Sequence, residues 1–414
     1  MAANKTLSDL VAQLSSLVNS GSEGPEKHQQ ISRLAEDIVD ASRPPCADWA
    51  KRLAPCFEAV ALRLFIEWNV FEAIPLGATI SYANLAKAVK ADESLIRERK
   101  LPGSSDSRLS TDTLVERLAW SLIRVGILSQ VGEDELAHTK YSKLYLPGQP
   151  DRTLFCFNYD ETLVPAAKMR EYFDKYGRKE PGEETHNPMG FGFGMPEKTS
   201  YELYYLTPER RVRFQESMNF VQFAFTPMTG MYDFGWIGDK LHEIDNGRVV
   251  FVDVGSGKGH ITKAILKENP FIPRERCVLQ DRPDIIEAVT AMKDPGLAGV
   301  QFQTHNFHTP QPIKGALIYW IRRCLHNYGD EICINVLAQM AGSMASDSKL
   351  LIVDNVVPNP PAIKECVLDF IMLNLGGKER TAKGWEDLVA RAGLRLAKVH
   401  GMDKELQVIE CVKA

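Results

Sequence analysis

The stretch Val252-Asp253-Val254-Gly255-Ser256-Gly257-Lys258-Gly259 decides the fold predicted for this chain. It follows Arg248-Val249-Val250-Phe251, so an apolar, β-branched run typical of a buried strand ends in a turn rich in glycine. The residues from His260 to Glu268 then have helical spacing. A strand, a glycine turn and a helix in succession let the backbone approach a nucleotide-like cofactor at the carboxyl end of a sheet.

The spacing of these glycines narrows the choice of cofactor. It is Gly-x-Gly-x-Gly with Asp253 just before it, whereas pyrophosphate-binding turns have Gly-x-Gly-x-x-Gly. This difference favours S-adenosylmethionine over NAD. A second apolar run, Cys277 to Gln280, ends at Asp281, whose carboxylate we expect to accept the ribose hydroxyl protons. The alternative role for Asp281 is a cap on the helix expected from Pro283 onward.

The composition argues against several classes of protein. The 414 residues are enough for two domains, and a net charge of −5 with a pI near 6.1 gives no electrostatic footprint for nucleic acid. The eight cysteines lack the short paired spacings of zinc sites and disulfide frameworks, so we expect reduced thiols. Without a signal-like amino terminus or a run of roughly 20 apolar residues, we expect a cytoplasmic protein with a small-molecule partner and no membrane contact.

The first part of the chain is predicted to be mainly helical. Apolar residues recur at helical spacing from Leu7 to Leu17, from Ile31 to Ile38 and from Ala54 to Ile74. A helix from Leu114 to Val125, then an apolar run and the turn Gly132-Glu133-Asp134-Glu135, indicates the helix and hairpin of a winged-helix unit. Such a unit can bind DNA or support dimerisation, and the mixed charges nearby favour dimerisation.

Two further segments are known only by their composition and spacing. The residues from Arg97 to Thr113 lack periodicity, so we expect an exposed loop. Between Pro150 and Gly247 we expect more helices, including one from Pro208 to Phe223. The aromatic and methionine residues of this segment include Phe191, Phe193, Met195, Tyr201, Met218, Phe220, Phe223, Phe225 and Met228. We expect core packing for most of them, and an apolar substrate pocket is the alternative.

Seven ordered stretches of the second half resemble the motifs of the class I plant and fungal O-methyltransferases related to caffeate O-methyltransferase. They are Phe251 to His260, Val278 to Ile285, Phe307 to Pro312, Tyr319 to Val336, Leu350 to Pro358, Gly376 to Thr381, and Ala392 to Leu396. Three earlier stretches resemble that family's dimerisation domain: Leu64 to Trp68, Tyr82 to Ala88, and Thr199 to Leu203. The resemblance implies S-adenosylmethionine as cofactor, a homodimer, and a hydroxyl acceptor on an aromatic or polyketide-type secondary metabolite.

The expected fold is an α/β Rossmann-like methyltransferase domain preceded by a mainly α-helical dimerisation domain with a winged-helix unit. We expect the dimerisation domain at residues 1–150. A helical connector that forms the substrate pocket should follow at 151–246, and the domain that binds S-adenosylmethionine at 247–414.

The resemblance also assigns the site residues. The family's base is the histidine of a Leu/Cys-His-Asp-Trp motif, and His326 has that place here. Asp354 and Glu379 match the two carboxylates that orient the base, and no metal is expected. A phenol with a pKa near 10 needs such a base at neutral pH. The expected cofactor-binding residues are Asp253, Gly255, Gly257, Gly259, Asp281, Arg282, Asn306, Phe307 and Arg322.

Departures from the family pattern leave a second function open. The family's His-Asp-Trp becomes His326-Asn327-Tyr328, an acidic residue that contacts adenine in relatives becomes Asn306, and Arg282 stands where leucine is frequent. Some fungal members of the fold do not methylate and instead steer dehydrations or pericyclic reactions of polyketide-derived substrates. Such an enzyme needs no phenol base, so the retained His326 favours methyl transfer. A third class, a non-enzymatic regulatory protein, predicts a lost base or a basic helix face, and the sequence has neither.

Overall fold

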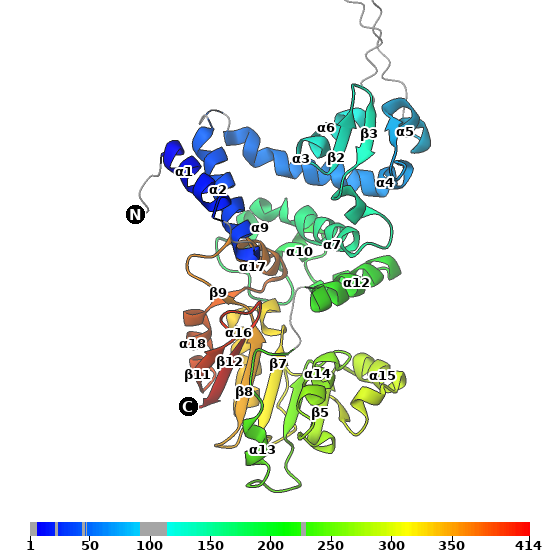
Figure 1. Ribbon diagram of the computed structural model, residues 1–414. Helices are drawn as coiled ribbons and strands as arrows, with labels where there is room; N and C mark the ends of the chain where they lie inside the picture. Colours follow the sequence, from blue (N-terminus) through cyan, green and yellow to red (C-terminus); the bar gives the residue numbers. More distant parts are fainter. Residues whose placement is uncertain (1–5, 21–23, 44–45, 47, 92–113, 225–228) are drawn as a thin grey trace, which may run out of the picture. The chain divides into compact units, whose positions relative to one another are not determined.

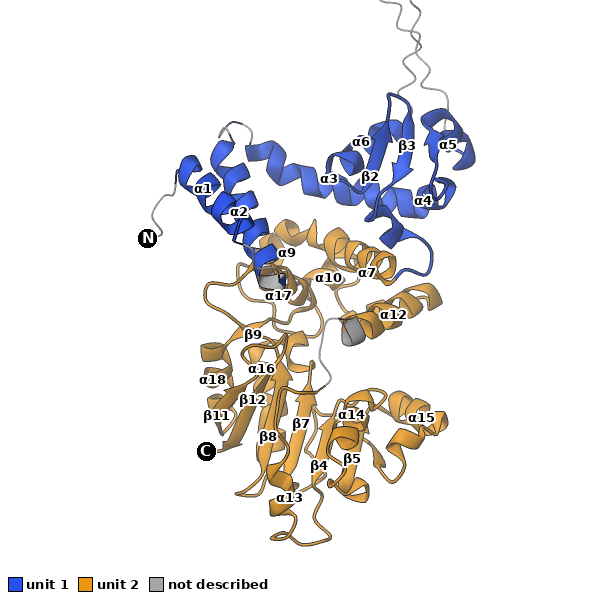
Figure 2. Cartoon of the chain, viewed as in Figure 1, with its two compact units in different colours: residues 1–149 blue, residues 150–414 orange. Residues whose placement is uncertain are grey.

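The computed structural model describes residues 6–20, 24–43, 46, 48–91, 114–224 and 229–414. The chain forms two compact units, Met1–Gln149 and Pro150–Ala414 (Figure 2). The segment 151–246, predicted as a connector, lies within the second unit. The loop expected from Arg97 to Thr113 lies outside the described residues, as do the side chains of Phe223, Phe225 and Met228.

The first unit is mainly helical and contains a small antiparallel sheet. Its helices are α1 (Leu7–Val18), α2 (Pro25–Ser42), α3 (Asp48–Glu67), α4 (Val70–Ala73), α5 (Tyr82–Ala88), α6 (Leu114–Arg124) and the 3-10 turn η2 (Ser142–Tyr145). Its described strands pair in the order β1 (Thr79–Ser81), β3 (Glu135–His138), β2 (Leu128–Val131). The predicted helix and hairpin are therefore present as α6 and β2–β3, while the periodicity gave no sign of β1. The winged-helix assignment itself stays a prediction.

The apolar stretch predicted as one helix from Ala54 to Ile74 is divided between two helices. The chain breaks at Asn69, which has φ 54° and ψ 37°, in the left-handed region that asparagine tolerates better than most residues. The break brings the rings of Phe65 and Phe71 to a centroid distance of 6.1 Å, and both side chains are fully buried. The apolar spacing therefore continues across a turn that only the single asparagine marks.

The second unit begins with helices and contains a sheet with further helices. The elements before the sheet are α7 (Pro150–Asn158), the π-helical turn η3 (Tyr159–Leu163), α8 (Val164–Ala166), α9 (Met169–Tyr176), α10 (Pro188–Gly192), α11 (Ser200–Tyr204), α12 (Pro208–Ala224) and α13 (Trp236–Lys240). The expected helix from Pro208 is thus confirmed as α12. In the described part of the chain, none of the helices combines the length and apolar character needed to cross a membrane.

The large sheet of the second unit has, among the described residues, seven strands in the order β11-β12-β8-β7-β4-β5-β6. Their bounds are β4 (Phe251–Val254), β5 (Cys277–Asp281), β6 (Gln301–Thr304), β7 (Ile318–Arg322), β8 (Lys349–Asp354), β11 (Leu394–His400) and β12 (Gln407–Lys413). Neighbours from β6 to β8 pair in parallel, whereas β12 is antiparallel to both β8 and β11. The order reverses between β4 and β7, which is where doubly wound sheets bind ligands.

Helices cover both faces of this sheet (Figure 1). They are α14 (His260–Glu268) and α15 (Pro283–Met292) on one face, with α13, and α16 (Asp330–Ala341) and α18 (Ala382–Arg391) on the other. Side chains alternate along each strand, so Phe251 and Trp320 pack on the α14 face while Val252 and Tyr319 pack on the α16 face. The helix predicted from His260 to Glu268 is confirmed at both ends. The expected α/β domain is therefore present.

Candidate active site

The glycine turn follows β4 at the point where the strand order reverses. Gly255 has φ +71°, and a Cβ built on it would lie 2.8 Å from Sγ of Cys324. Gly259 has φ +72°, and its Cβ would lie 2.6 Å from the side chain of Leu279. Both the backbone conformation and the space available therefore require glycine at these two positions.

Asp281, the last residue of β5, is anchored to the glycine turn through its carboxylate. Its Oδ2 accepts from the backbone N–H of Gly257 at 2.7 Å, and its Oδ1 accepts from the N–H of Arg282 at 2.8 Å. Each oxygen keeps one further acceptor position for a ligand hydroxyl. Burial raises the pKa of Asp281, against these two hydrogen bonds. The alternative role as a helix cap is wrong, because the residue before Pro283 is Arg282, which caps α15 without a side-chain bond.

Asp253, in the strand β4 just before the glycine turn, binds to the helix that follows the turn. It is buried, and its Oδ2 accepts from Oγ1 of Thr262 in α14 at 2.6 Å. Burial raises its pKa to about 7, and the charge of Arg322 opposes this shift. Arg322 ends β7, and burial lowers its pKa to about 10. Asp253 therefore links β4 to α14, and the charge of Arg322 at the end of β7 acts on it.

The remaining residues predicted for the cofactor lie at the rim of the turn. The ring of Phe307 is half-buried and comes within 3.9 Å of the Cβ position of Gly255. Asn306 is exposed, and its Oδ1 accepts from the N–H of His308 at 3.1 Å. The side chain of Arg282 is half-exposed and pairs with Asp284 at 3.1 Å. The structure therefore brings Phe307 to the turn. The side chains of Asn306 and Arg282 instead bind residues next to them in the chain.

His326 lies in the short 3-10 turn η6 (Leu325–Asn327) that follows β7. It is buried, and its Nδ1 lies 3.1 Å from Oε1 of Glu379 and 3.4 Å from Oδ1 of Asp354. Asp354 ends β8, and Glu379 precedes β10 (Arg380–Thr381), a short strand paired with β9 (Val356–Val357). Three segments far apart in the sequence thus meet at one imidazole. With Nδ1 facing the carboxylates, Nε2 is the nitrogen left for a substrate.

The two carboxylates change the acid–base behaviour of the imidazole. Burial alone would lower the pKa of His326, but the charge of Asp354 and the hydrogen bond to Glu379 outweigh it, so the pKa is raised. For Glu379, the bond from His326 overcomes the effect of burial and lowers the pKa. Burial raises the pKa of Asp354 despite the nearby imidazole. The geometry is that of a base whose protonated form is stabilised by charge.

The same three residues also satisfy the geometry of a metal site. Their donor atoms lie within 4.8 Å of one another. However, a metal bound here would take the Nδ1 position that already faces Glu379 at hydrogen-bond distance. The contacts present therefore fit a base held by two carboxylates, and a chelator decides between the two interpretations.

The helical segment before the sheet packs against the turn that carries His326. A Cβ built on Gly329 would lie 2.6 Å from Cα of Gly182, and one built on Gly376 would lie 2.7 Å from the carbonyl oxygen of Glu183. Gly377 is closer still to the base, because its Cβ would lie 2.1 Å from the carbonyl oxygen of His326. The residues just before α10, Gly182 and Glu183, therefore pack closely against the segments that carry His326 and Glu379.

Core packing was predicted for most of nine aromatic and methionine residues between Phe191 and Met228, and this is wrong for the six whose side chains the structure describes. Phe191, Phe193 and Phe220 are half-buried, while Met195, Tyr201 and Met218 are exposed. A different set from that segment is buried: Phe157, Met189, Leu203 and Tyr204. Helical spacing marks where a side chain lies on its own helix but cannot tell which face meets another element. Of the exposed residues, Met195 and Tyr201 lie in the segments just after α10, which packs against the helix α17 (Ile363–Leu375).

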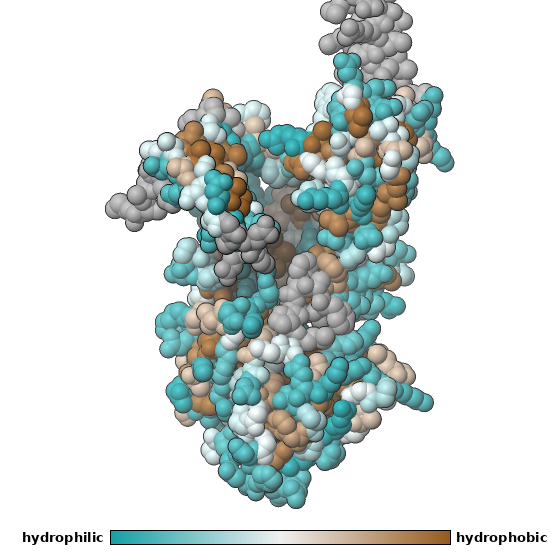
Figure 3. Space-filling model, in the orientation of Figure 1, coloured by the Kyte–Doolittle hydropathy of each residue, from teal (hydrophilic) through white to brown (hydrophobic). Residues whose placement is uncertain are grey.

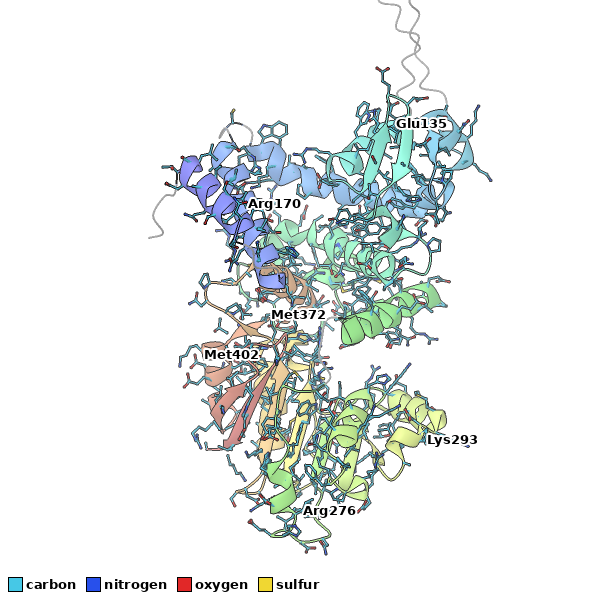
Figure 4. All side chains as sticks on the ribbon, viewed as in Figure 1. Glu135, Arg170, Arg276, Lys293, Met372 and Met402 are labelled. Atoms are coloured by element: carbon cyan, nitrogen blue, oxygen red, sulfur yellow. The ribbon has the colours of Figure 1, made fainter. Side chains whose placement is uncertain are left out.

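The end of α17 links this segment to the base. Met372 (Figure 4) is nearly buried, and its carbonyl oxygen accepts from the N–H of Gly377 at 2.9 Å. The N–H of Lys378 then donates to the carbonyl oxygen of His326 at 2.9 Å. Sequence reasoning found the carboxylate of Glu379 here but missed the part that its neighbours play, because their partners lie some 50 residues earlier in the chain.

Comparison with known proteins places the chain in a family. The sequence model of the O-methyltransferase domain matches residues 189–395. Methyltransferase cfoD of Aspergillus candidus is 32% identical over 99% of this chain and 98% of its own length. The chain belongs to the O-methyltransferase family, whose cofactor is S-adenosylmethionine.

Two solved structures have the same fold. OxaC in complex with SAH and oxaline superposes with a TM-score of 0.79 at 22% identity, covering 99% of both chains. A pericyclic reaction enzyme superposes with a TM-score of 0.73 at 19% identity, again covering 99% of both chains. At this level of identity the two structures establish the shared fold.

Proposed function

We propose that the chain is an S-adenosylmethionine-dependent O-methyltransferase acting on a phenolic or enolic hydroxyl of an aromatic or polyketide-type metabolite. The observation that carries this proposal is the buried imidazole of His326, held through Nδ1 by Glu379 and Asp354. A reaction that needs only shape and hydrogen-bond donors would have no use for two carboxylates behind one imidazole.

The glycine turn has the features required for the cofactor. Asp281 keeps two acceptor positions, Gly255 allows close approach, and Oγ of Ser256 is a buried atom without a hydrogen-bond partner among the described residues. S-adenosylmethionine supplies an electrophilic methyl group on a sulfonium. In this proposal Asp281 binds the ribose, Phe307 packs on the adenine, and Asp253 and Arg322 hold the ends of the strands beneath.

The chain's own part in the reaction is to move one proton. Nδ1–H of His326 donates to Glu379, so Nε2 accepts the proton of the acceptor hydroxyl as the oxygen attacks the methyl carbon. The imidazolium that results lies beside the two carboxylates, which offset the cost of a buried charge. Burial of the turn keeps water from competing for the proton.

The acceptor site is proposed next to the half-buried and exposed aromatic and methionine residues of the helical segment. Phe191 and Phe193 flank the end of α10, which packs on α17. Flat and polarizable side chains suit a large apolar acceptor. We propose the following role for each segment: residues 1–150 mediate dimerisation, residues 151–246 form the substrate pocket, and residues 247–414 bind the cofactor.

A homodimer is part of the proposal because the first unit exposes apolar stripes on its helices. On α3, side chains at positions that share one helix face are 39% to 68% exposed: Trp49, Leu53, Phe57 and Val60. On α1, Leu7, Val11 and Val18 are 42% to 52% exposed, and Figure 3 shows apolar surface in this region. Monomers seldom expose such stripes, and a second copy of this chain would cover them.

The second candidate is a pericyclase or dehydratase that does not transfer methyl. It is favoured by the fold shared with a pericyclic reaction enzyme and by the altered residues after the base. However, those residues have structural partners. Nδ2 of Asn327 donates to the carbonyl oxygen of Cys324 at 3.2 Å, and the ring of Tyr328 packs edge-on to Phe307 at 6.1 Å. Their departure from the family pattern therefore needs no change of chemistry.

The variant His326→Ala tests the proposal. Removal of a general base costs roughly 10² to 10⁴ in rate, while the dissociation constant for S-adenosylmethionine should stay within a few fold because the imidazole serves the acceptor. His242, which is exposed after α13, provides the matched control His242→Ala. Unchanged turnover in His326→Ala would overturn the proposed mechanism.

A further inference from the structure

Three consecutive residues hold the turn that carries His326, and only the middle one has a role in the mechanism described above. The N–H of Lys378 donates to the carbonyl oxygen of His326 at 2.9 Å, and Glu379 bonds to its Nδ1. Arg380 follows, with its side chain 1% exposed. A fully buried guanidinium is expensive unless nearly all its donors have acceptors.

The guanidinium of Arg380 donates hydrogen bonds to backbone carbonyl oxygens around the base. Nη1 donates to the carbonyl oxygen of Leu325 at 3.3 Å, and Nη2 donates to that of Tyr328 at 3.0 Å. These two carbonyls lie on either side of His326 in the turn. The guanidinium therefore grips η6 at both ends.

Asp330, the first residue of α16, fixes the guanidinium in turn. Its Oδ1 accepts from Nε of Arg380 at 3.0 Å and from Nη2 at 2.8 Å. The charges of Arg380 and Lys378 overcome the effect of burial and lower the pKa of Asp330, so it stays ionised. The guanidinium also lies 5.3 Å from the ring of Trp385 in α18. The contacts that Arg380 makes with the turn are thus supported from two helices, α16 and α18.

We propose that Arg380, held by Asp330, is a positioning residue that sets the distance of His326 from Glu379 and Asp354. This inference rests on the proposed role of His326 as the base. Arg380 touches no reacting atom and acts through the backbone of the turn. If the turn shifts, Nδ1 moves away from the two carboxylates that favour its charged form, and the burial that disfavours this form remains. The pKa of His326 then falls.

The test uses Arg380→Lys and Asp330→Asn in the full chain. Lysine keeps the charge but has no fork to reach both carbonyls. We expect kcat to fall roughly 10-fold to 100-fold, as for small misplacements of catalytic groups, with KM for S-adenosylmethionine within about 2-fold of wild type. The acid limb of the kcat–pH profile should move to lower pH. A loss of folded protein alone would lower the rate equally at every pH.

A matched control comes from the same two helices. Arg391 of α18 pairs with Glu331 of α16 at 2.5 Å on the surface, with side chains 52% and 78% exposed. Arg391→Lys should leave both kcat and the pH profile unchanged. In addition, Arg380→Lys combined with His326→Ala should be no slower than His326→Ala alone, since Arg380 acts only through the imidazole.

The outcomes separate this inference from the proposed function. If His326→Ala is inactive while Arg380→Lys and Asp330→Asn keep the kcat and acid limb of wild type, the positioning role is wrong and the base stands. If His326→Ala is fully active, the proposed base is wrong and the inference falls with it. A fall in kcat with an unmoved acid limb, or an additive loss in the double variant, would also overturn the positioning role.

Discussion

Replacement of Asp281 is the sharpest test of the cofactor site. Each of its two carboxylate oxygens accepts one backbone N–H and keeps one acceptor position for a ligand hydroxyl. Asp281→Ala removes the acceptor for the N–H groups of Gly257 and Arg282 and for both ribose hydroxyls. Two hydrogen bonds to a charged acceptor contribute about 1.5 to 3 kcal/mol each, so the affinity for S-adenosylmethionine should fall by about 3 to 6 kcal/mol, or roughly 10²-fold to 10⁴-fold.

Asp281→Asn gives a finer measure of the same interaction. The amide keeps the shape of the carboxylate but has no charge and only one acceptor oxygen. One ribose bond is then weakened by about 1 kcal/mol and the other is lost at about 1.5 to 3 kcal/mol, so the affinity should fall roughly 10²-fold to 10³-fold. Titration calorimetry with S-adenosylmethionine measures both values. Asp284→Asn is the matched control, since Asp284 follows on the same segment and pairs at the surface with Arg282.

The result that would refute this reasoning is an affinity of Asp281→Ala within about 2-fold of wild type. Equal losses in Asp281→Asn and Asp284→Asn would also contradict it, because a general change in surface charge would then explain the data. Circular dichroism of each variant should match wild type, since the turn keeps its other bonds, from the N–H groups of Gly255 and Ser256 to the carbonyl oxygen of Gln280.

The remaining predictions concern protons and metals. Because the base works only when neutral and its pKa is raised, kcat should fall as the pH drops through a value above 6.5, and Glu379→Gln should move this limb to lower pH, as a kcat–pH profile would reveal. The raised pKa also contributes stability that is fully present below pH 6.5 and is lost as the pH rises through the folded-state value, so His326→Ala should flatten this trend in thermal melts. Excess EDTA should leave the rate unchanged, and a loss restored by a divalent cation would favour the metal interpretation of His326, Asp354 and Glu379.

The sequence predicted the cofactor turn well because the signals there are local. Gly255 and Gly259 adopt positive φ angles, which a tight turn between a strand and a helix often requires. The helix α14 begins and ends where its apolar spacing indicated. The break at Asn69 was missed because one residue in the left-handed region leaves the apolar period intact on both sides.

The site was predictable only as far as a family motif marks it. His326, Asp354 and Glu379 lie together as the resemblance implied. The contacts of Arg380 escaped prediction because Leu325 and Tyr328 offer backbone carbonyls, which leave no trace in the sequence. The exposure of Tyr201 and Met218 likewise depends on which helix face meets a neighbour, and spacing within one helix carries no information on that.

The most direct test of the central claim is a single incubation with methyl-labelled S-adenosylmethionine and a panel of phenolic and enolic acceptors. If the chain is an O-methyltransferase, the product carries the label on oxygen, and His326→Ala yields none while still binding the cofactor. Conversion of an acceptor to an isomer or a dehydrated product without label would contradict the account and establish the second candidate function instead.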